Sequence, residues 1–371
     1  MFVRRIAVVG VGYVGLTTGA CLASLGHRVV CADTNEDKVE ALRDGQVSLL
    51  EPGLTELVAQ GLAAGRLDFV VGARSAVPDA EVVFFCVPTP MGEGGRADLA
   101  AVESVAAEVS ELLRPGCVVV NKSTVPVGTA ARTAELLGRA DVAVVSNPEF
   151  LREGSAVADF LNPDRIVVGS DAQDAAERVA GLYARLGAPT VLTDAASAEM
   201  VKYVANCFLA MKLSYVNAVA ELCERLGADV LDVTEGIGYD RRIGQAFLSP
   251  GPGWGGSCLP KDTYALLQVA AAADFDFGLL QASLDTNIRQ RERMVDKVRD
   301  AVGGSLSGVR IGLLGLTFKA GTDDLRGSPA LAVATLLRGE GAELVGYDPG
   351  VLRAVPGMTD DLEVVDDPLK V

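Results

Sequence analysis

The chain begins with a pattern of strand, glycine-rich turn, helix and strand. The continuous β-branched run IAVVG, residues 6–10, is typical of a strand buried on both faces, and GVGYVG, residues 10–15, follows at once. The apolar segment 16–26 then predicts a helix that ends at Gly26, and RVVCAD, residues 28–33, predicts the next strand. This order predicts a βαβ unit of a parallel sheet.

The α/β pattern continues and then gives way to long helices. Further strands are predicted within residues 80–90, 117–129 and 142–150, with a helix over about 99–113. Residues 196–226 predict one long helix, residues 290–301 lie in another, and residues 309–349 repeat strand, loop, helix and strand. We therefore predict an α/β protein with two doubly wound, Rossmann-like domains. The first covers residues 1–195 and the second 301–371, and a central helical region over 196–300 joins them.

Charge and hydropathy narrow the classes of partner. The 371 residues are 49% hydrophobic and carry a formal net charge of −16. Such a charge repels phosphate backbones and anionic lipids, so neither a nucleic acid nor a membrane surface is expected as a partner. The basic, apolar N-terminus could be scored as a secretory signal, but its glycine spacing argues against this. No other stretch approaches 18 uninterrupted apolar residues, so no transmembrane helix is expected.

The histidine and cysteine counts restrict the chemistry. His27 is the only histidine, which excludes His-dependent triads and His-rich zinc sites, and no metal site is expected. We interpret His27 itself as a solvated residue just past a helix end. The seven cysteines form no CxxC pair and are odd in number, so we expect reduced thiols and a cytoplasmic protein.

The first βαβ unit carries a dinucleotide-binding fingerprint. Gly10, Gly12 and Gly15 follow a strand and open a helix, and Asp33 ends the next strand. The glycines permit a tight turn and close approach of a pyrophosphate, while the carboxylate can bind a ribose 2′-hydroxyl. Since Asp33 would repel a 2′-phosphate, NAD is favoured over NADP. The alternative is a glycine-rich turn without a ligand.

Polar residues at the predicted strand ends and in two loops are further candidates. Thr89, Thr124 and Glu149 follow strands and should meet at one rim of the sheet, although turn chemistry alone explains the threonines equally well. Lys202 and Asn206 share one face of the long helix, where a solvated lysine is the alternative.

The segment 247–262 is rich in glycine and proline, and it places Cys258 near Lys261 and Asp262. These neighbours make Cys258 a candidate nucleophile, and an unreactive thiol is the alternative. Lys319 and Arg326, in the loop of the last α/β repeat, could neutralise phosphates or form a solvated charged loop.

Six segments in order resemble one family, over residues 4–349. They are GVGYVGL, STVPVGT, NPEFLREGSAVADFLNPDRIVVG, EMVKYVANCFLAMKLSYVNAVAELC, GGSCLPKD and GLTFKAGTDDLRGSPA. Together they resemble the nucleotide-sugar dehydrogenases of the UDP-glucose/GDP-mannose dehydrogenase family. The stretch IGYDRRIGQAFLSPGPGWGGSC, residues 237–258, is similar to the branch that acts on UDP-glucose.

The resemblance implies three sets of site residues. The catalytic set would be Cys258 as nucleophile, Asp262 near the hydrolytic water, Glu153 as base or water positioner, Lys202 and Asn206 at the oxyanion, and Thr124. The NAD contacts would be Gly10, Gly12, Gly15, Asp33, Lys38, Thr89, Thr124, Glu153, Lys261 and Arg326. The substrate contacts would be Glu149, Phe150, Leu151, Arg152, Glu153, Lys202, Asn206, Phe247, Leu248, Ser249, Pro250, Gly251, Gly255, Lys319 and, across a homodimer interface, Arg242.

The resemblance also implies a reaction. It implies the NAD-dependent four-electron oxidation of UDP-glucose to UDP-glucuronate, through a thiohemiacetal and a thioester on Cys258. Alternatives are the same reaction on GDP-mannose, a two-electron hydroxyacid or hydroxyacyl dehydrogenase, and an inactive nucleotide-sugar-binding homologue. The family's C-terminal domain continues past the strand ending in YDP, so we expect residues 301–371 to form an incomplete domain.

Overall fold

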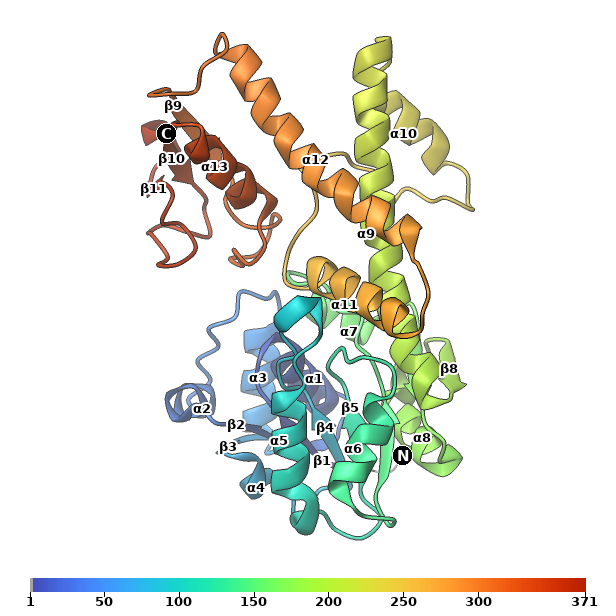
Figure 1. Ribbon diagram of the computed structural model, residues 1–371. Helices are drawn as coiled ribbons and strands as arrows, with labels where there is room; N and C mark the ends of the chain where they lie inside the picture. Colours follow the sequence, from blue (N-terminus) through green and yellow to red (C-terminus); the bar gives the residue numbers. More distant parts are fainter. Residues whose placement is uncertain (1–2) are drawn as a thin grey trace. The chain divides into compact units, whose positions relative to one another are not determined.

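The computed structural model (Figure 1) describes residues 3–371, which divide into two compact units. The first unit extends to Tyr203, and the second covers Val204–Val371. The division falls inside one long helix, α9 (Ala195–Leu226). Neither boundary of the domains expected from the sequence, at 195 and at 300, is tested by this division, and both stay predictions. No helix within residues 3–371 is both long enough and apolar enough to span a bilayer.

The first unit alternates strands and helices, as the sequence pattern predicts. Its strands are β1 (Arg5–Val9), β2 (Arg28–Asp33), β3 (Leu67–Val71), β4 (Val82–Phe85), β5 (Val118–Asn121), β6 (Ala143–Ser146), β7 (Ile166–Gly169) and β8 (Thr190–Thr193). Its α-helices, before α9, are α1 (Tyr13–Ser24), α2 (Glu36–Arg43), α3 (Leu54–Ala63), α4 (Ala73–Ala76), α5 (Ala100–Val109), α6 (Thr129–Leu137), α7 (Ala156–Leu161) and α8 (Gln173–Ala180). Short 3₁₀ turns cover Glu93–Gly95, Ser110–Leu112 and Gly181–Leu186.

These strands form one mixed sheet in the order β3-β2-β1-β4-β5-β6-β7-β8. The six strands from β3 to β6 are parallel and have the strand order of a Rossmann fold, which reverses between β1 and β4. Strand β7 then pairs antiparallel with β6, through Ser146 and Gly169, so the sheet is not parallel throughout. Ligands of such sheets bind at the carboxyl ends of the strands, beside the point of reversal.

Both faces of the central strands of this sheet are buried, which is why these strands are continuous apolar runs, whereas the edge strand β8 is largely exposed. Along β1, Ile6 and Val8 enter one hydrophobic cluster with residues of α1 and α3, while Ala7 and Val9 enter a second cluster with residues of α5. Helices therefore cover the sheet on both sides (Figure 1), as the β-branched pattern of the strands predicts.

The interpretation of His27 as a solvated residue is wrong. Its side chain is 2% exposed; its Nδ1 accepts a hydrogen bond from the Arg4 backbone N–H, and its Nε2 lies 3.3 Å from the Leu182 carbonyl oxygen. Burial lowers the pKa of this imidazole. The residues that bury His27 come from distant parts of the chain, so the local sequence carries no sign of them.

The second unit combines long helices with a small sheet. Its helices are α10 (Val230–Gly238), α11 (Leu259–Ala272), α12 (Gly278–Ala301) and α13 (Pro329–Gly339), with a 3₁₀ turn at Pro368–Lys370. The strands β9 (Arg310–Leu314), β10 (Glu343–Tyr347) and β11 (Glu363–Val364) form a parallel sheet in the order β11-β10-β9. The repeat predicted over 309–349 is thus a βαβ unit, to which β11 adds a third parallel strand, and a doubly wound topology of this part stays a prediction.

Candidate active site

The glycine-rich turn between β1 and α1 has two glycines that packing requires and one that leaves space. Gly10 has a φ of +91°, and a Cβ there would lie 2.7 Å from the Cys86 carbonyl oxygen. A Cβ on Gly15 would lie 1.8 Å from the Gly10 carbonyl oxygen. A Cβ on Gly12, by contrast, would meet no protein atom within 4 Å. Gly12 is also the N-cap of α1 and has no side chain to cap it, so backbone N–H groups are open to an anion here.

Asp33 lies beside this turn at the end of β2. Its carboxylate accepts hydrogen bonds from the backbone N–H groups of Val11 and Asn35, both at 3.0 Å, and lies 3.5 Å from Lys38 Nζ. Burial by itself would raise the pKa of Asp33, but these hydrogen bonds and the lysine charge outweigh it and hold the pKa below its usual value. An ionised carboxylate beside an open glycine turn fits the ribose and pyrophosphate of NAD.

The strand-end residues expected at one rim do meet there. Thr89 Oγ1, after β4, donates to the Thr124 carbonyl oxygen, after β5, at 2.8 Å. Glu149, after β6, forms an ion pair with Lys202 of α9, with 2.9 Å between Oε1 and Nζ. Both charged side chains are buried, so the alternative of a solvated Lys202 is wrong. Burial opposes the charge of Glu149, but Lys202 and the Leu151 N–H hold its pKa below the usual value.

Aromatic and charged residues surround this ion pair. The ring of Phe150 lies 5.4 Å from Lys202 Nζ and 3.6 Å from the guanidinium of Arg165, both measured to the ring centroid. Arg152 is exposed and pairs with Asp159 of α7 at 2.5 Å, and Leu151 and Glu153 are half-buried. The segment 149–153 therefore holds a buried carboxylate at one end and a second carboxylate at the other.

Three buried charged residues of this unit, Glu51, Lys122 and Glu199, are missing from the sequence-based candidates. Lys122 Nζ donates to Asn147 Oδ1 at 3.1 Å and to Tyr183 Oη at 3.4 Å, and burial lowers its pKa to about 8. Glu199, three residues before Lys202 on α9, accepts hydrogen bonds from the N–H groups of Gly128 and Ala130 and from the Ser146 hydroxyl. In the sequence, Lys122 stands among polar residues after a strand and Glu199 lies three residues before Lys202, so neither position signals burial.

In the second unit, Asp262 is the centre of a buried polar group. The side chain of Asp262 is in the first turn of α11, and the residue is 0% exposed. Asn206 Nδ2 of α9 donates to its Oδ2 at 2.6 Å, and Lys261 Nζ donates to its Oδ1 at 2.7 Å. Both carboxylate oxygens of Asp262 are thus satisfied by side-chain donors.

Cys258 begins the same helix. It is the N-cap of α11 and is exposed, whereas the other six cysteines of residues 3–371 are buried. The amino end of a helix favours an anionic group, and an exposed thiol can reach a substrate. The sequence-based contrast between Cys258 and the buried cysteines is thus confirmed.

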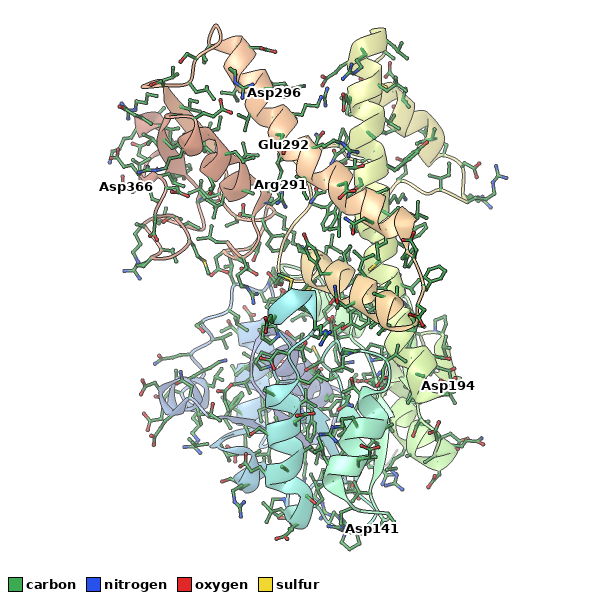
Figure 2. The ribbon with its side chains drawn as sticks, in the orientation of Figure 1. Asp141, Asp194, Arg291, Glu292, Asp296 and Asp366 are labelled. Atoms are coloured by element: carbon green, nitrogen blue, oxygen red, sulfur yellow. The ribbon has the colours of Figure 1, made fainter. Side chains whose placement is uncertain are left out.

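The glycine-rich segment before Cys258 is fixed by neighbouring helices. Gly251 donates its N–H to Asn217 of α9 at 2.8 Å and accepts from Gln290 of α12 at 2.7 Å. Trp254 donates its indole N–H to Ser214 at 2.8 Å, and its carbonyl oxygen accepts from Arg291, labelled on α12 in Figure 2, at 2.9 Å.

The remaining candidates of this unit differ in exposure and in what they contact. A Cβ on Gly255 would lie 1.9 Å from the Gly327 carbonyl oxygen, so Gly255 is required by the chain's own backbone. Phe247 has a φ of +61°, and Leu248 is buried. Ser249 is exposed and Pro250 is half-buried. Exposed Arg242 pairs with Asp240 at 2.6 Å, Arg326 pairs with Asp324 at 2.7 Å, and Lys319 Nζ lies 5.6 Å from the Phe318 ring. Within residues 3–371, no three His, Cys, Asp or Glu side chains are grouped to hold a metal ion.

Solved structures and sequences of known proteins resemble the chain over nearly its full length. It is 46% identical to a UDP-glucose 6-dehydrogenase of Rhizobium meliloti, over 98% of this chain and 86% of that protein. It is also 46% identical to the UDP-glucose 6-dehydrogenase TuaD of Bacillus subtilis, over 93% and 76%. The structure of a UDP-glucose dehydrogenase from Pyrobaculum islandicum matches with a TM-score of 0.93 and 40% identity, over 100% of this chain and 87% of that one.

Three domain models of one family match successive parts of the sequence. The NAD binding domain of the UDP-glucose/GDP-mannose dehydrogenase family matches residues 4–187, the family's central domain matches 196–289, and its UDP binding domain matches 312–371. The prediction of NAD as cofactor is thereby confirmed, as is the resemblance stated from the motifs. The chain belongs to the UDP-glucose/GDP-mannose dehydrogenase family.

Proposed function

We propose that this chain oxidises UDP-glucose to UDP-glucuronate with two molecules of NAD. The observation that carries the reaction type is the exposed Cys258 thiol at the start of α11, four residues before the buried Asp262. The UDP binding domain match and the relatives that act on UDP-glucose support the substrate.

The proposed chemistry needs a thiol because the aldehyde must stay bound between two oxidations. Each NAD⁺, when bound, accepts one hydride from C6 of the sugar. After the first oxidation, Cys258 Sγ bonds to the aldehyde carbon, and the carbonyl oxygen takes a proton to give a thiohemiacetal. Loss of the C6 hydride and the hydroxyl proton leaves a thioester. Water then adds to the thioester carbonyl, and the carbon–sulfur bond breaks to release the thiolate and the acid. The sum is R–CH₂OH + 2 NAD⁺ + H₂O → R–COO⁻ + 2 NADH + 3 H⁺.

In this proposal, buried donors stabilise the charge that develops on the sugar oxygen. Lys202 and Asn206, one turn apart on α9, provide an ammonium and an amide. Asp262, Thr124 and Glu153 hold or activate the hydrolytic water. Because carboxylates and lysines can carry these proton transfers, the reaction needs no histidine.

Substrate and cofactor contacts follow the sets that the resemblance implies. NAD would be bound at Gly10, Gly12, Gly15, Asp33, Lys38, Thr89, Thr124, Glu153, Lys261 and Arg326. The sugar side would comprise Glu149, Phe150, Leu151, Arg152, Glu153, Lys202 and Asn206, and the UDP side Phe247, Leu248, Ser249, Pro250, Gly251, Gly255 and Lys319. We propose a homodimer in which Arg242 completes the site of the other subunit.

The test is the ratio of NADH formed to UDP-glucose consumed, with GDP-mannose assayed in parallel. We expect a ratio of two with UDP-glucose. A ratio of two with GDP-mannose alone would assign the other branch, a ratio of one would indicate a two-electron dehydrogenase, and no NADH from either would reject the proposed function.

Cys258→Ala tests the mechanism. We expect it to abolish acid formation while leaving NAD binding unchanged, since the thiol lies outside the glycine turn. Cys223→Ala, which removes a buried thiol, is the matched control and should retain activity. Undiminished UDP-glucuronate production by Cys258→Ala would rule out the thioester.

A further inference from the structure

A tyrosine in the glycine-rich turn is hydrogen-bonded to the loop that carries Glu153. Tyr13, the first residue of α1, donates its hydroxyl to Glu51 Oε2. The Gly154 backbone N–H donates both to Tyr13 Oη, at 2.7 Å, and to Glu51 Oε2, at 2.8 Å. The Tyr13 hydroxyl, the Glu51 carboxylate and the Gly154 N–H are distant in sequence and are hydrogen-bonded to one another. Gly154 directly follows Glu153.

The same carboxylate also holds the start of the next helix. Glu51 is 6% exposed, and its other oxygen, Oε1, accepts from the Val157 N–H at 3.3 Å in the first turn of α7. On the other side of Glu153, the Arg152 N–H donates to Asp159 of α7 at 2.9 Å. The backbone is therefore anchored immediately before and immediately after Glu153.

Burial and nearby negative charge determine which group donates the proton in these hydrogen bonds. Burial raises the pKa of Tyr13 far above its usual value, and the hydrogen bond to Glu51 and the charges of Glu51 and Glu153 raise it further. The phenol therefore keeps its proton. It donates that proton to the Glu51 carboxylate and accepts the N–H of Gly154 on the same oxygen.

We propose that Tyr13 and Glu51 are positioning residues that hold Glu153 in a fixed relation to the NAD-binding turn. Tyr13 stands between Gly12 and Gly15 in the sequence, so the segment that packs on the cofactor also orients the loop of Glu153. This inference rests on the proposed function, in which Glu153 acts on the water that hydrolyses the thioester. Loss of the Tyr13 hydroxyl should then slow hydrolysis more than either hydride transfer.

Rapid mixing of the full chain with UDP-glucose and saturating NAD separates these steps. For wild type and for Tyr13→Phe and Glu51→Gln, we measure the first burst of NADH, the steady rate, and the acyl adduct on Cys258 by mass spectrometry after acid quench. We expect the variants to keep a burst of two NADH per thiol. Their steady rate should fall about tenfold or more, the change that about 1.4 kcal/mol of lost positioning produces, and the adduct should accumulate.

The matched control is Ser110→Ala. It also removes one hydroxyl hydrogen bond from the first unit, which Ser110 donates to the Leu137 carbonyl oxygen at 2.6 Å, away from the turn and the loop in sequence. It should leave both phases unchanged. A steady rate of Tyr13→Phe within twofold of wild type would overturn the proposal, as would an equal loss in burst and steady rate.

Hydrogen–deuterium exchange tests the positioning without substrate. The peptide covering 150–157 should exchange faster in Tyr13→Phe than in wild type, while peptides of the sheet should not change. Unchanged exchange would overturn the proposal even where Glu51→Gln fails to fold. If wild type forms no NADH from UDP-glucose, the proposed function fails, and this measurement still decides whether Tyr13 holds the loop.

Discussion

Replacing Lys122 with methionine should make the protein more stable than wild type at neutral pH and less stable than wild type at alkaline pH. Lys122 is 5% exposed, and burial is the main cause that lowers its pKa from 10.5 to about 8. Lys202 contributes in the same direction, while Cys86 and Glu149 oppose it. The side chain still makes two hydrogen bonds, to Asn147 and Tyr183. Burial of the charge and the hydrogen bonds therefore act in opposite directions.

The sign of the pH dependence follows from proton binding. Between pH 8 and about 10.5 the unfolded lysine is protonated and the folded one is not, so the contribution of Lys122 to the stability of wild type rises with pH in this window. At about 1.36 kcal/mol per pKa unit, the buried charge costs about 3 kcal/mol at pH 7, and about 2.5 kcal/mol of that is regained by pH 10. Methionine removes this penalty but also the two hydrogen bonds, together worth about 1–2 kcal/mol.

We therefore expect Lys122→Met to be more stable than wild type by about 1 kcal/mol at pH 7 and less stable at pH 10. Urea unfolding followed by far-UV circular dichroism at pH 7, 8, 9 and 10 measures the difference, and subtraction at each pH cancels the other titrating groups. Lys297→Met, which removes a surface lysine that pairs with Glu224 at 2.5 Å, is the control and should show no comparable trend with pH. A difference between Lys122→Met and wild type that does not change with pH would refute the reasoning.

Further predictions concern the glycine turn and the hydrogen bonds of Glu199 to the start of α6. Gly15→Ala should lower the melting temperature, because its Cβ would collide with the Gly10 carbonyl oxygen, whereas Gly12→Ala should melt like wild type and yet lose NADH binding, measured by fluorescence titration. Wild-type NADH affinity in Gly12→Ala would show that the open space at Gly12 does not receive the cofactor. Glu199→Ala should cost about 2 kcal/mol or more in urea unfolding, since it leaves the N–H of buried Ala130 and the hydroxyl of buried Ser146 without their partner. Glu177→Ala, at an exposed site, should change stability by less than about 0.5 kcal/mol. A similarly small effect of Glu199→Ala would contradict the structural role given to the hydrogen bonds of Glu199.

The sequence by itself determined the features that depend on neighbours along the chain. The β-branched run 6–9, the glycines that follow it and Asp33 specify strand, turn, helix and strand through local geometry, and the structure has each of them. The long helix predicted over 196–226 is α9, and its bounds differ by one residue at one end. Cys258 was separable from the other cysteines because its neighbours are polar and glycine-rich while theirs are apolar.

Only the tertiary structure decided which charges and polar groups are buried and which partners satisfy them. Glu149 meets Lys202 across 53 residues, Tyr13 meets Glu51 and Gly154, and His27 is enclosed by Arg4 and Leu182. Gly255 is required by Gly327, and the antiparallel pairing of β7 rests on one contact, between Ser146 and Gly169. A hydrogen bond or an ion pair in a low-dielectric interior depends on the position of both partners to within a fraction of an ångström. Local spacing places each residue on its strand or helix, and the packing of those elements against one another sets the distances between them.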